Sequence, residues 1–271
     1  MDLPVERWHP AIFARVSRRV FATAAIEADR LARLEALAGE FRPFPGARAV
    51  VVRESPEAVF RGLLGGYGKV KGAPHYAAFI GDTSSPHLQE AVGYLGEAVI
   101  LEATALGLGT CWVGGFFRPE SVAGHIELGP AEKVLAVTPI GRAAGKVGLA
   151  ERSMKAFVRA ASRRAVTDLV IAGAARAEWQ HKALEAARLA PSARNRQPWR
   201  FRVDDRSITV AMDSPRDSRG LSKRLDCGIA MLHLELGARS AGAVGRWELL
   251  APPDVAIYRL AAPFHPGRDR V

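Results

Sequence analysis

Hydrophobic and polar positions follow two kinds of helical pattern along this chain. The segments 87–109 and 225–242 are apolar almost all round, which is typical of helices that lie in the middle of a fold. The segments 9–21 and 26–41 instead carry apolar residues at helical spacing, so they predict amphipathic helices near the start of the chain. The pattern indicates two central helices with other elements packed around them.

Runs rich in β-branched residues fall between the helices and predict strands. The runs on either side of Asp204 and Asp205 predict a hairpin. Shorter helices are expected near 56–64, within the basic stretch 152–171 and over 181–190. The predicted strands or extended segments are 47–54, 75–82, 110–116, 133–143, 199–205, 206–213 and 246–252.

The two central helices align with each other without gaps at a constant offset of 135 residues. Identities between two alanine- and glycine-rich helices are weak support for a repeat, and chance similarity of buried helices is the alternative. A true repeat would mean two copies of one fold unit packed as an internal pseudo-dimer. The matched pairs are Gly93 with Gly228, Ala103 with Ala238, Gly107 with Gly242, and Trp112 with Trp247.

The composition is that of an ordinary globular protein with one large domain or two small ones. The 271 residues are 48% hydrophobic and 24% charged. Cys111 and Cys227 lie in apolar stretches, which favours core positions over a disulfide or a metal site. The first ten residues carry acids and a proline where a signal peptide needs an apolar run. The segment 98–115 is interrupted by Glu102 and glycines. We therefore expect a cytoplasmic protein with no membrane partner.

The formal net charge of +10 at pH 7 has three competing explanations: nucleic-acid binding, attraction of anionic ligands, or a basic proteome background. Most of the arginines are scattered, and neither zinc-finger spacing nor a basic region followed by heptads is present. The basic cluster at 152–164 has helical spacing and predicts a solvated helix face. We expect no nucleic-acid partner, while a positive field would attract phosphorylated cofactors.

One segment near the start of the chain carries residues suited to a phosphate. Arg15, Ser17 and Arg19 form a basic-hydroxyl-basic pattern. The arginine guanidinium donates paired N–H hydrogen bonds to phosphate oxygens, and the serine hydroxyl adds a neutral donor. The more common meaning of such a pattern, taken alone, is a solvated basic helix end.

Two further segments are candidates for binding a flat ligand. The loop 190–199 holds Ser192, Asn195 and Gln197, whose hydroxyl and amides can read the heteroatom edge of a planar ring. A plain helix-to-strand turn is the alternative, but such a turn needs neither this length nor these amides. The segment 107–116 has paired glycines, which let a backbone N–H approach a flat ligand closely. Its alternative is a tight turn between packed elements.

Together these segments resemble the nitroreductase family of flavoproteins. The first resembles the Arg-x-Ser-x-Arg-x-aromatic motif, which ends here at Phe21, and 190–199 resembles the Ala-Pro-Ser-x-x-Asn-x-Gln-Pro-Trp signature. The segments 98–116 and 136–141 resemble the family's central helix and late strand. In ordinary members the loop follows soon after the first motif, whereas here it comes about 175 residues later. This order resembles a two-lobed, TM nitroreductase-like subfamily in which one chain supplies both halves of the usual dimer.

The resemblance spans roughly residues 10–250 and implies an α+β, nitroreductase-like fold. Two half-lobes would form an internal pseudo-dimer, each with a mainly antiparallel sheet around a central apolar helix. Residues 1–172 are assigned to the first lobe and 173–271 to a second, shorter lobe. Such a chain could act as a monomer or as a homodimer. The resemblance also strengthens the case for the internal repeat.

The resemblance implies one FMN site built from both lobes. Arg15, Ser17 and Arg19 would hold the phosphate and ribityl end, and Arg163 or Arg164 would complete the phosphate site. Because the first lobe lacks the loop signature and the second lacks the arginine motif, one FMN per chain and one dead pseudo-site are expected. The other residues implied are Gly114 and Gly115 at the flavin N5, Lys69 and Lys71 near the pyrimidine edge, and Pro191, Ser192 and Asn195 covering the flavin.

The function implied by the resemblance is that of an FMN-dependent NAD(P)H oxidoreductase. Hydride would pass by ping-pong kinetics through the flavin N5 to a nitroaromatic, a quinone or another small electron-poor acceptor. No catalytic acid, base, nucleophile or metal is required, and the seven scattered histidines are expected to be surface or core residues. The alternatives are a flavin-binding or flavin-processing protein without nitroreductase activity, a degenerate lobe pair that binds flavin weakly, and a nucleic-acid binder.

Overall fold

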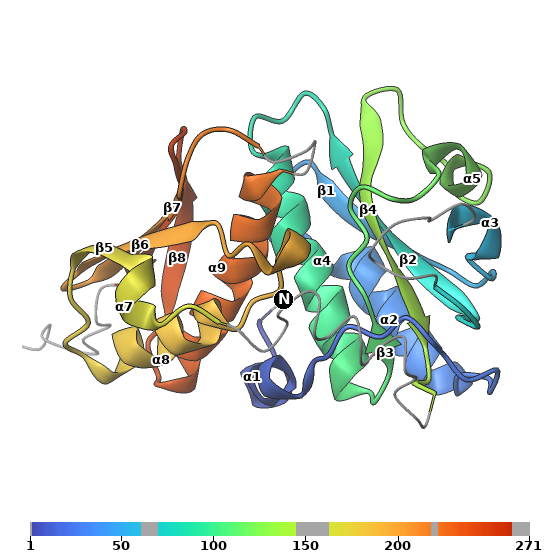
Figure 1. Ribbon diagram of the computed structural model, residues 1–271, viewed down its shortest axis with the longest axis horizontal. Coiled ribbons are helices and arrows are strands. Elements are labelled where there is room, and N and C mark those ends of the chain that lie inside the picture. Colours follow the sequence, from blue (N-terminus) through green and yellow to red (C-terminus); the bar gives the residue numbers. More distant parts are fainter. Residues whose placement is uncertain (1, 61–69, 145–162, 218–221, 262–271) are drawn as a thin grey trace, which may run out of the picture.

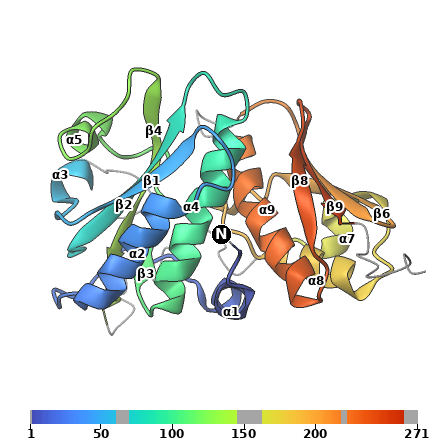
Figure 2. The same ribbon diagram turned by 180° about the vertical axis from the view of Figure 1, so that it is seen from behind.

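The two apolar segments form a pair of helices at the centre of the molecule, α4 (Leu88–Ala105) and α9 (Lys223–Ser240). Figures 1 and 2 show them side by side, with one sheet beyond each helix. Each helix has 18 residues, and the two begin and end at positions 135 apart. The structure is a computed structural model, and it describes residues 2–60, 70–144, 163–217 and 222–261.

The first lobe packs a sheet of order β1-β2-β4-β3 against α4, and every neighbouring pair of strands is antiparallel. Side chains alternate along β2, so Ala77 and Phe79 join the core around α4, whereas Tyr76 and Ile80 join a smaller cluster beneath α3 and α5. In chain order the elements around α4 are α2 (Ala28–Glu40), β1 (Ala47–Val52), α3 (Glu57–Phe60), β2 (His75–Asp82), β3 (Gly109–Thr110), α5 (Pro119–Ala123) and β4 (Glu132–Gly141).

The second lobe packs a sheet of order β5-β6-β7-β9-β8 against α9. Only β5 is parallel to its neighbour, β6, and β5 spans the lobe boundary expected at residue 172. The other described pairs in this sheet are antiparallel. The elements are α7 (Val166–Leu169), β5 (Val170–Gly173), α8 (Glu178–Arg188), a 3-10 turn at Ala193–Asn195, β6 (Trp199–Asp204), β7 (Ser207–Met212), β8 (Gly245–Leu249) and β9 (Asp254–Leu260).

The two lobes repeat the same order of elements. Apart from the short helices α3 and α5, which lie between strands of the first lobe, a helix, two strands, a long helix and two strands make up α2-β1-β2-α4-β3-β4 in the first lobe and α8-β6-β7-α9-β8-β9 in the second. The strand order β1-β2-β4-β3 also matches β6-β7-β9-β8. Both long helices are followed by a left-handed glycine, Gly107 or Gly242, each with φ of 75°. The lobes therefore share one architecture.

The contact between α4 and α9 is reciprocal. A Cβ added at Gly93 would lie 2.1 Å from the Leu225 carbonyl oxygen, and one added at Gly228 would lie 2.1 Å from the Glu90 carbonyl oxygen. Leu225 and Glu90 are themselves 135 residues apart, as the two glycines are. A pair of contacts in which each partner plays both roles is the pattern that a two-fold interface makes. The missing side chains allow the two backbones to touch.

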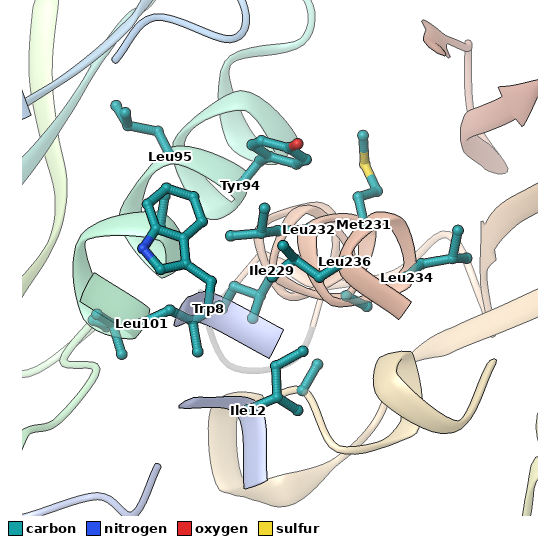
Figure 3. Close-up of a cluster of buried hydrophobic side chains, with 14 of the residues drawn as sticks. Trp8, Ile12, Tyr94, Leu95, Leu101, Ile229, Met231, Leu232, Leu234 and Leu236 are labelled. Carbon is teal, nitrogen blue, oxygen red and sulfur yellow. The ribbon is translucent and has the colours of Figure 1, made fainter. Parts of the chain in front are cut away.

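A continuous core joins the lobes around these helices. Helix α1 (Val5–Ala14) lies across α4 and α9 and contributes Trp8 and Ile12, both buried. Figure 3 shows these two side chains beside Leu101 of α4 and Ile229 of α9. The Trp8 ring nitrogen donates to the buried Glu102 carboxylate, which Arg7 and Arg33 also contact. Burial of this aromatic side chain and its polar anchor fix α1 to both lobes.

The α+β class with mainly antiparallel sheets is confirmed, as are the two central helices and the predicted strands at 47–54 and 75–82. The predicted helix over 9–21 is wrong beyond Ala14, because the chain turns extended at Arg15 and pairs with strands. Strand β9 was not expected, since its residues Val255 to Tyr258 are all buried and show no alternation. Cys111 and Cys227 are both buried, as predicted.

Candidate functional site

The arginine motif is an extended segment beside the first sheet. The Arg18 backbone N–H donates to the Thr110 carbonyl at 2.7 Å, and Ser17 pairs with Thr110 as an isolated bridge. Gly109 permits this approach, because an added Cβ would lie 3.0 Å from Arg18 Cγ. Gly109 thus allows close packing of the motif, whereas Gly107 provides the positive φ that follows α4. The motif is held in place by backbone hydrogen bonds.

Arg15, the first residue of the motif, is buried beside a carboxylate without a close hydrogen bond. Its side chain is 8% exposed, and its Nε lies 3.8 Å from Oε1 of Glu97, which is fully buried on α4. Arg15 Nε finds no hydrogen-bond acceptor among the described residues. A buried guanidinium N–H without an acceptor is costly. An oxygen-rich anion at this position would supply the missing acceptor.

Arg163 brings the same region into contact with the second lobe. Its Nη1 donates to the Ala190 carbonyl and to Oδ1 of Asn195, both at 2.8 Å. Burial, and then the charges of Arg15 and Arg188, lower the pKa of the Arg163 guanidinium to about 10, while Glu97 opposes this shift. The guanidinium stays charged at neutral pH. The effect of Arg15 on this pKa shows that the two guanidinium charges lie near each other.

The loop 190–199 adopts a constrained backbone. Arg194, Asn195 and Gln197 all have positive φ, between 49° and 56°, which costs each non-glycine residue about 1 kcal/mol. The loop closes on itself, because Ser192 Oγ accepts from the Gln197 backbone N–H at 3.0 Å. Gln197 Oε1 accepts from the backbone N–H of Arg164 at 2.8 Å. The amides therefore hold the loop shape and tie it to the arginine segment.

A buried acid at the start of α9 anchors this loop. Asp226 is 3% exposed and accepts from the Ala193 backbone N–H at 3.1 Å and from Arg196 Nε at 2.7 Å. Arg196 also donates to the Ser222 carbonyl at 2.6 Å. Burial raises the pKa of the Asp226 carboxyl to about 6, against the opposing effect of Arg196. Asp226 was not identified from the sequence, where it is one acid at the edge of an apolar helix.

Glu97 connects the first lobe to the second at this site. Its carboxylate accepts from Trp112 Nε1 at 2.6 Å and lies 2.9 Å from Nε2 of His233, a fully buried residue of α9. The histidine was expected to be a core or surface residue, and it is in the core. Its pairing with Glu97 was not foreseen. The signal available in the sequence was an acid within a largely apolar helix, which must find partners when buried.

The other predicted site residues differ in exposure and position. Lys71 is exposed and held beside the motif, because its backbone N–H donates to the Arg19 carbonyl at 2.9 Å. Gly114 and Gly115 form an exposed bend that follows Trp112. Arg164 is exposed, Pro191 is buried, and Lys69 lies outside the described residues. Within the described part of the chain no group of His, Cys, Asp or Glu suits a metal ion.

The arrangement suits an anion held between the lobes. The buried Arg15 side chain and the partly buried Arg163 supply two positive charges, and Arg15 Nε has no hydrogen-bond acceptor among the described residues. Asn195 comes to the same place from the second lobe. Guanidinium groups bind phosphate oxygens through paired N–H donors, so a phosphate monoester such as that of FMN fits these residues.

Comparisons with known proteins place this arrangement in a family. A family model described as "Putative TM nitroreductase" matches residues 8–238. A solved structure titled as a putative nitroreductase from Thermotoga maritima MSB8 is 20% identical, with 96% of each chain covered and a TM-score of 0.61. At that identity the likeness concerns the fold.

A curated relative from Mycobacterium tuberculosis (strain CDC 1551 / Oshkosh), "Putative NAD(P)H nitroreductase acg", is 28% identical over 90 residues, which are 31% of this chain. The match spans 27% of the length of that relative. None of the described helices is long and apolar enough to cross a membrane. Because the family model covers most of the chain, and its fold matches a solved relative over nearly the full length, this protein belongs to the TM nitroreductase family.

Proposed function

We propose that this protein binds FMN between its lobes and acts as an NAD(P)H-dependent oxidoreductase. The observation that carries the proposal is that Arg163 donates to Asn195 at 2.8 Å and that the charge of Arg15 acts on Arg163, so residues of three distant segments lie near one another. Family membership supports the same reading, and the name of the mycobacterial relative supports NAD(P)H as the reductant.

The residues of the chain would act mainly by binding and orienting. Arg15 and Arg163 would neutralise the phosphate, with Ser17, Arg19 and Arg164 close by in sequence. When bound, FMN supplies the redox chemistry by taking electrons from the nicotinamide cofactor and passing them to an acceptor. Pro191, Ser192 and Asn195 would cover the flavin. The bend at Gly114 and Gly115 would present backbone to its N5, and Lys69 and Lys71 would lie near the pyrimidine edge.

The class of electron acceptor is inferred because hydride transfer through a flavin needs no catalytic acid or base from the protein. We infer a ping-pong sequence in which the oxidised nicotinamide leaves before a nitroaromatic, a quinone or another electron-poor small molecule enters. Such acceptors need only to stack on an exposed flavin face. The exposed position of the bend at Gly114 and Gly115 is compatible with an open face.

The repeat in the fold supports an internal pseudo-dimer with a single active site, divided at 1–172 and 173–271. The counterpart of the loop 190–199 lies between α2 and β1, where it contains Phe41 and Phe44 rather than hydroxyl and amide side chains. Both rings pack on Tyr94, at 6.4 and 5.1 Å between centroids. These packed aromatic side chains offer no hydroxyl or amide group to hydrogen-bond a second flavin. We further propose that the protein acts in the cytoplasm as a monomer, in which one chain forms the internal pseudo-dimer.

Reduction of the reconstituted protein tests the proposal. The purified chain would be loaded with FMN, desalted and treated anaerobically with NADH or NADPH while its flavin absorbance is followed. The proposal expects bleaching by at least one of the two, and recovery of the absorbance when a quinone or a nitroaromatic is added. Retained FMN that neither nucleotide bleaches would favour a flavin-binding protein without this activity. Failure to retain FMN would contradict the proposal as a whole.

A further inference from the structure

The buried pair Glu97 and His233 has no role in the site as described so far. Both side chains are fully buried, and they face each other across the contact of α4 and α9. The Nδ1 atom of His233 lies 3.1 Å from the Ala186 carbonyl oxygen. Its Nε2 lies 2.9 Å from Oε1 of Glu97. Each ring nitrogen therefore has a single protein acceptor in front of it.

The geometry fixes how many protons the pair holds: one on Nδ1 of His233 and one between its Nε2 and the Glu97 carboxyl. A carbonyl oxygen can only accept, so Nδ1 must carry a hydrogen. Nε2 faces a carboxyl oxygen, and two lone pairs at this distance would repel each other, so a proton must lie between them. The pair is then either imidazolium with carboxylate or neutral imidazole with carboxylic acid. In both forms Glu97 and His233 together carry no net charge.

This neutrality matters because two arginines lie close to Glu97. Arg15 Nε is 3.8 Å from its carboxylate, and Glu97 and Arg15 both act on the charge of Arg163. An unpaired Glu97 carboxylate would cancel one of these two positive charges. With His233 in place, both arginine charges remain for a ligand. His233 also acts on His9 of α1, because burial, then Lys182 and then His233 lower the pKa of the His9 imidazole.

We propose that His233 determines the preference of the site for a phosphorylated flavin over the same flavin without phosphate. It does so by supplying the proton that keeps Glu97 from neutralising Arg15 and Arg163. His233 is thus a positioning residue for charge, since it touches Glu97 rather than the ligand. This inference rests on the proposed function, and it adds a residue of the second lobe to the phosphate site.

The test compares FMN and riboflavin, which differ by the phosphate. Dissociation constants for both would be measured by flavin fluorescence for the wild type, H233Q and E97Q. Glutamine at 233 can still donate to Glu97 but carries no charge, so the preference for FMN should fall by at least about tenfold. Glutamine at 97 can accept from Trp112 and donate to His233, and it leaves both arginine charges in place. E97Q should therefore keep the wild-type preference.

Matched controls separate this effect from damage to the fold. His181 is exposed on α8, so H181Q should leave both affinities unchanged. The double variant E97Q/H233Q should regain the preference, because its pair is again neutral. An unchanged ratio in H233Q, or an equal loss of FMN and riboflavin binding, would overturn the inference while leaving the proposed function intact. A wild type that binds neither flavin would overturn both.

Discussion

Two buried glutamates, one on each central helix, show how the lobes differ. Glu97 of α4 accepts from Trp112, and Glu235 of α9 accepts from Trp247, the tryptophan 135 residues further on. Each glutamate also contacts the opposite lobe, Glu97 through His233 and Glu235 through Tyr94. The repeated fold thus provides the same kind of network twice.

The two networks differ in how closely an arginine pairs with the buried glutamate. Glu235 is paired with Arg239 on its own helix at 2.8 Å, so its charge is satisfied locally. Glu97 shares a proton with His233, and Arg15 Nε, at 3.8 Å from Glu97, has no close acceptor among the described residues. One copy of the network is complete in itself, whereas the other is arranged around two surplus positive charges. The comparison teaches that the repeat supplies the scaffold, while segments added to one copy supply the proposed binding site.

The largest expected effect is on the surplus charges themselves. Replacing Arg163 with methionine removes a cation and its bond to Asn195, so FMN affinity should fall about a hundredfold. Isothermal titration or fluorescence quenching would measure it. Arg176, whose side chain is 82% exposed, offers a control, since R176M should bind FMN as the wild type does. Equal losses in the two variants would mean that general charge, not this site, controls binding.

The shared scaffold is tested by the two glycines at the helix contact. G93A and G228A each place a methyl group 2.1 Å from a backbone oxygen, so each should lower the free energy of unfolding by about 3 kcal/mol. Urea denaturation would compare them. Gly39 of α2 has no atom within 4 Å of an added Cβ, so G39A should stabilise by up to about 1 kcal/mol. Clearly unequal effects of G93A and G228A would break the equivalence of the lobes.

The loop anchor adds a pH dependence that the first lobe lacks, because the counterpart of Asp226 is Ala91. The pKa of Asp226 is raised from 3.8 to about 6 in the folded protein. Its contribution to stability is therefore full below about pH 4 and is lost as the pH rises to about 6, on the order of 2 kcal/mol. Thermal or urea unfolding across this range should show the loss in the wild type and not in D226N.

A control for this pH series is D205N, since the Asp205 side chain is 90% exposed. It should keep the slope of the wild type between pH 4 and pH 6. If D226N also keeps that slope, the carboxyl of Asp226 is not the group that titrates there.

The smallest expected effect is in the second network. Y94F removes one hydrogen bond to Glu235, which still accepts from Trp247 and Arg239, so the free energy of unfolding should fall by about 1 kcal/mol. FMN affinity should not change, because this carboxylate lies in the network that lacks surplus charge. A loss of FMN preference in Y94F like that expected in H233Q would show that the two networks are not functionally distinct.

Much of the scaffold could be predicted from local pattern. The all-round apolar segments gave the two central helices, and the β-branched runs gave β1 and β2 with few errors at the ends. The arginine motif was placed in a helix because its apolar spacing continues that of α1. Its true conformation depends on backbone hydrogen bonds to Thr110 and Lys71, and no local pattern reveals partners so far along the chain.

The site was predictable where a short motif contains it and not where it depends on tertiary pairing. Arg15, Arg163 and Asn195 were predicted as site residues from motifs; Arg163 contacts Asn195, and the charge of Arg15 acts on Arg163. Glu97 and His233 lie 136 positions apart and meet only because α4 packs on α9. An acid in an apolar helix indicates that a partner exists, but periodicity alone cannot name it.

The stoichiometry of FMN tests the central claim most directly. A titration of the purified chain with FMN, followed by desalting and by measurement of flavin and protein in the same sample, gives moles of FMN per chain. The account predicts one, bound by the cationic cluster between the lobes, with the aromatic counterpart around Phe41 and Tyr94 left without flavin. A value near two would contradict the distinction between the two halves, and a value near zero would contradict the flavin site itself.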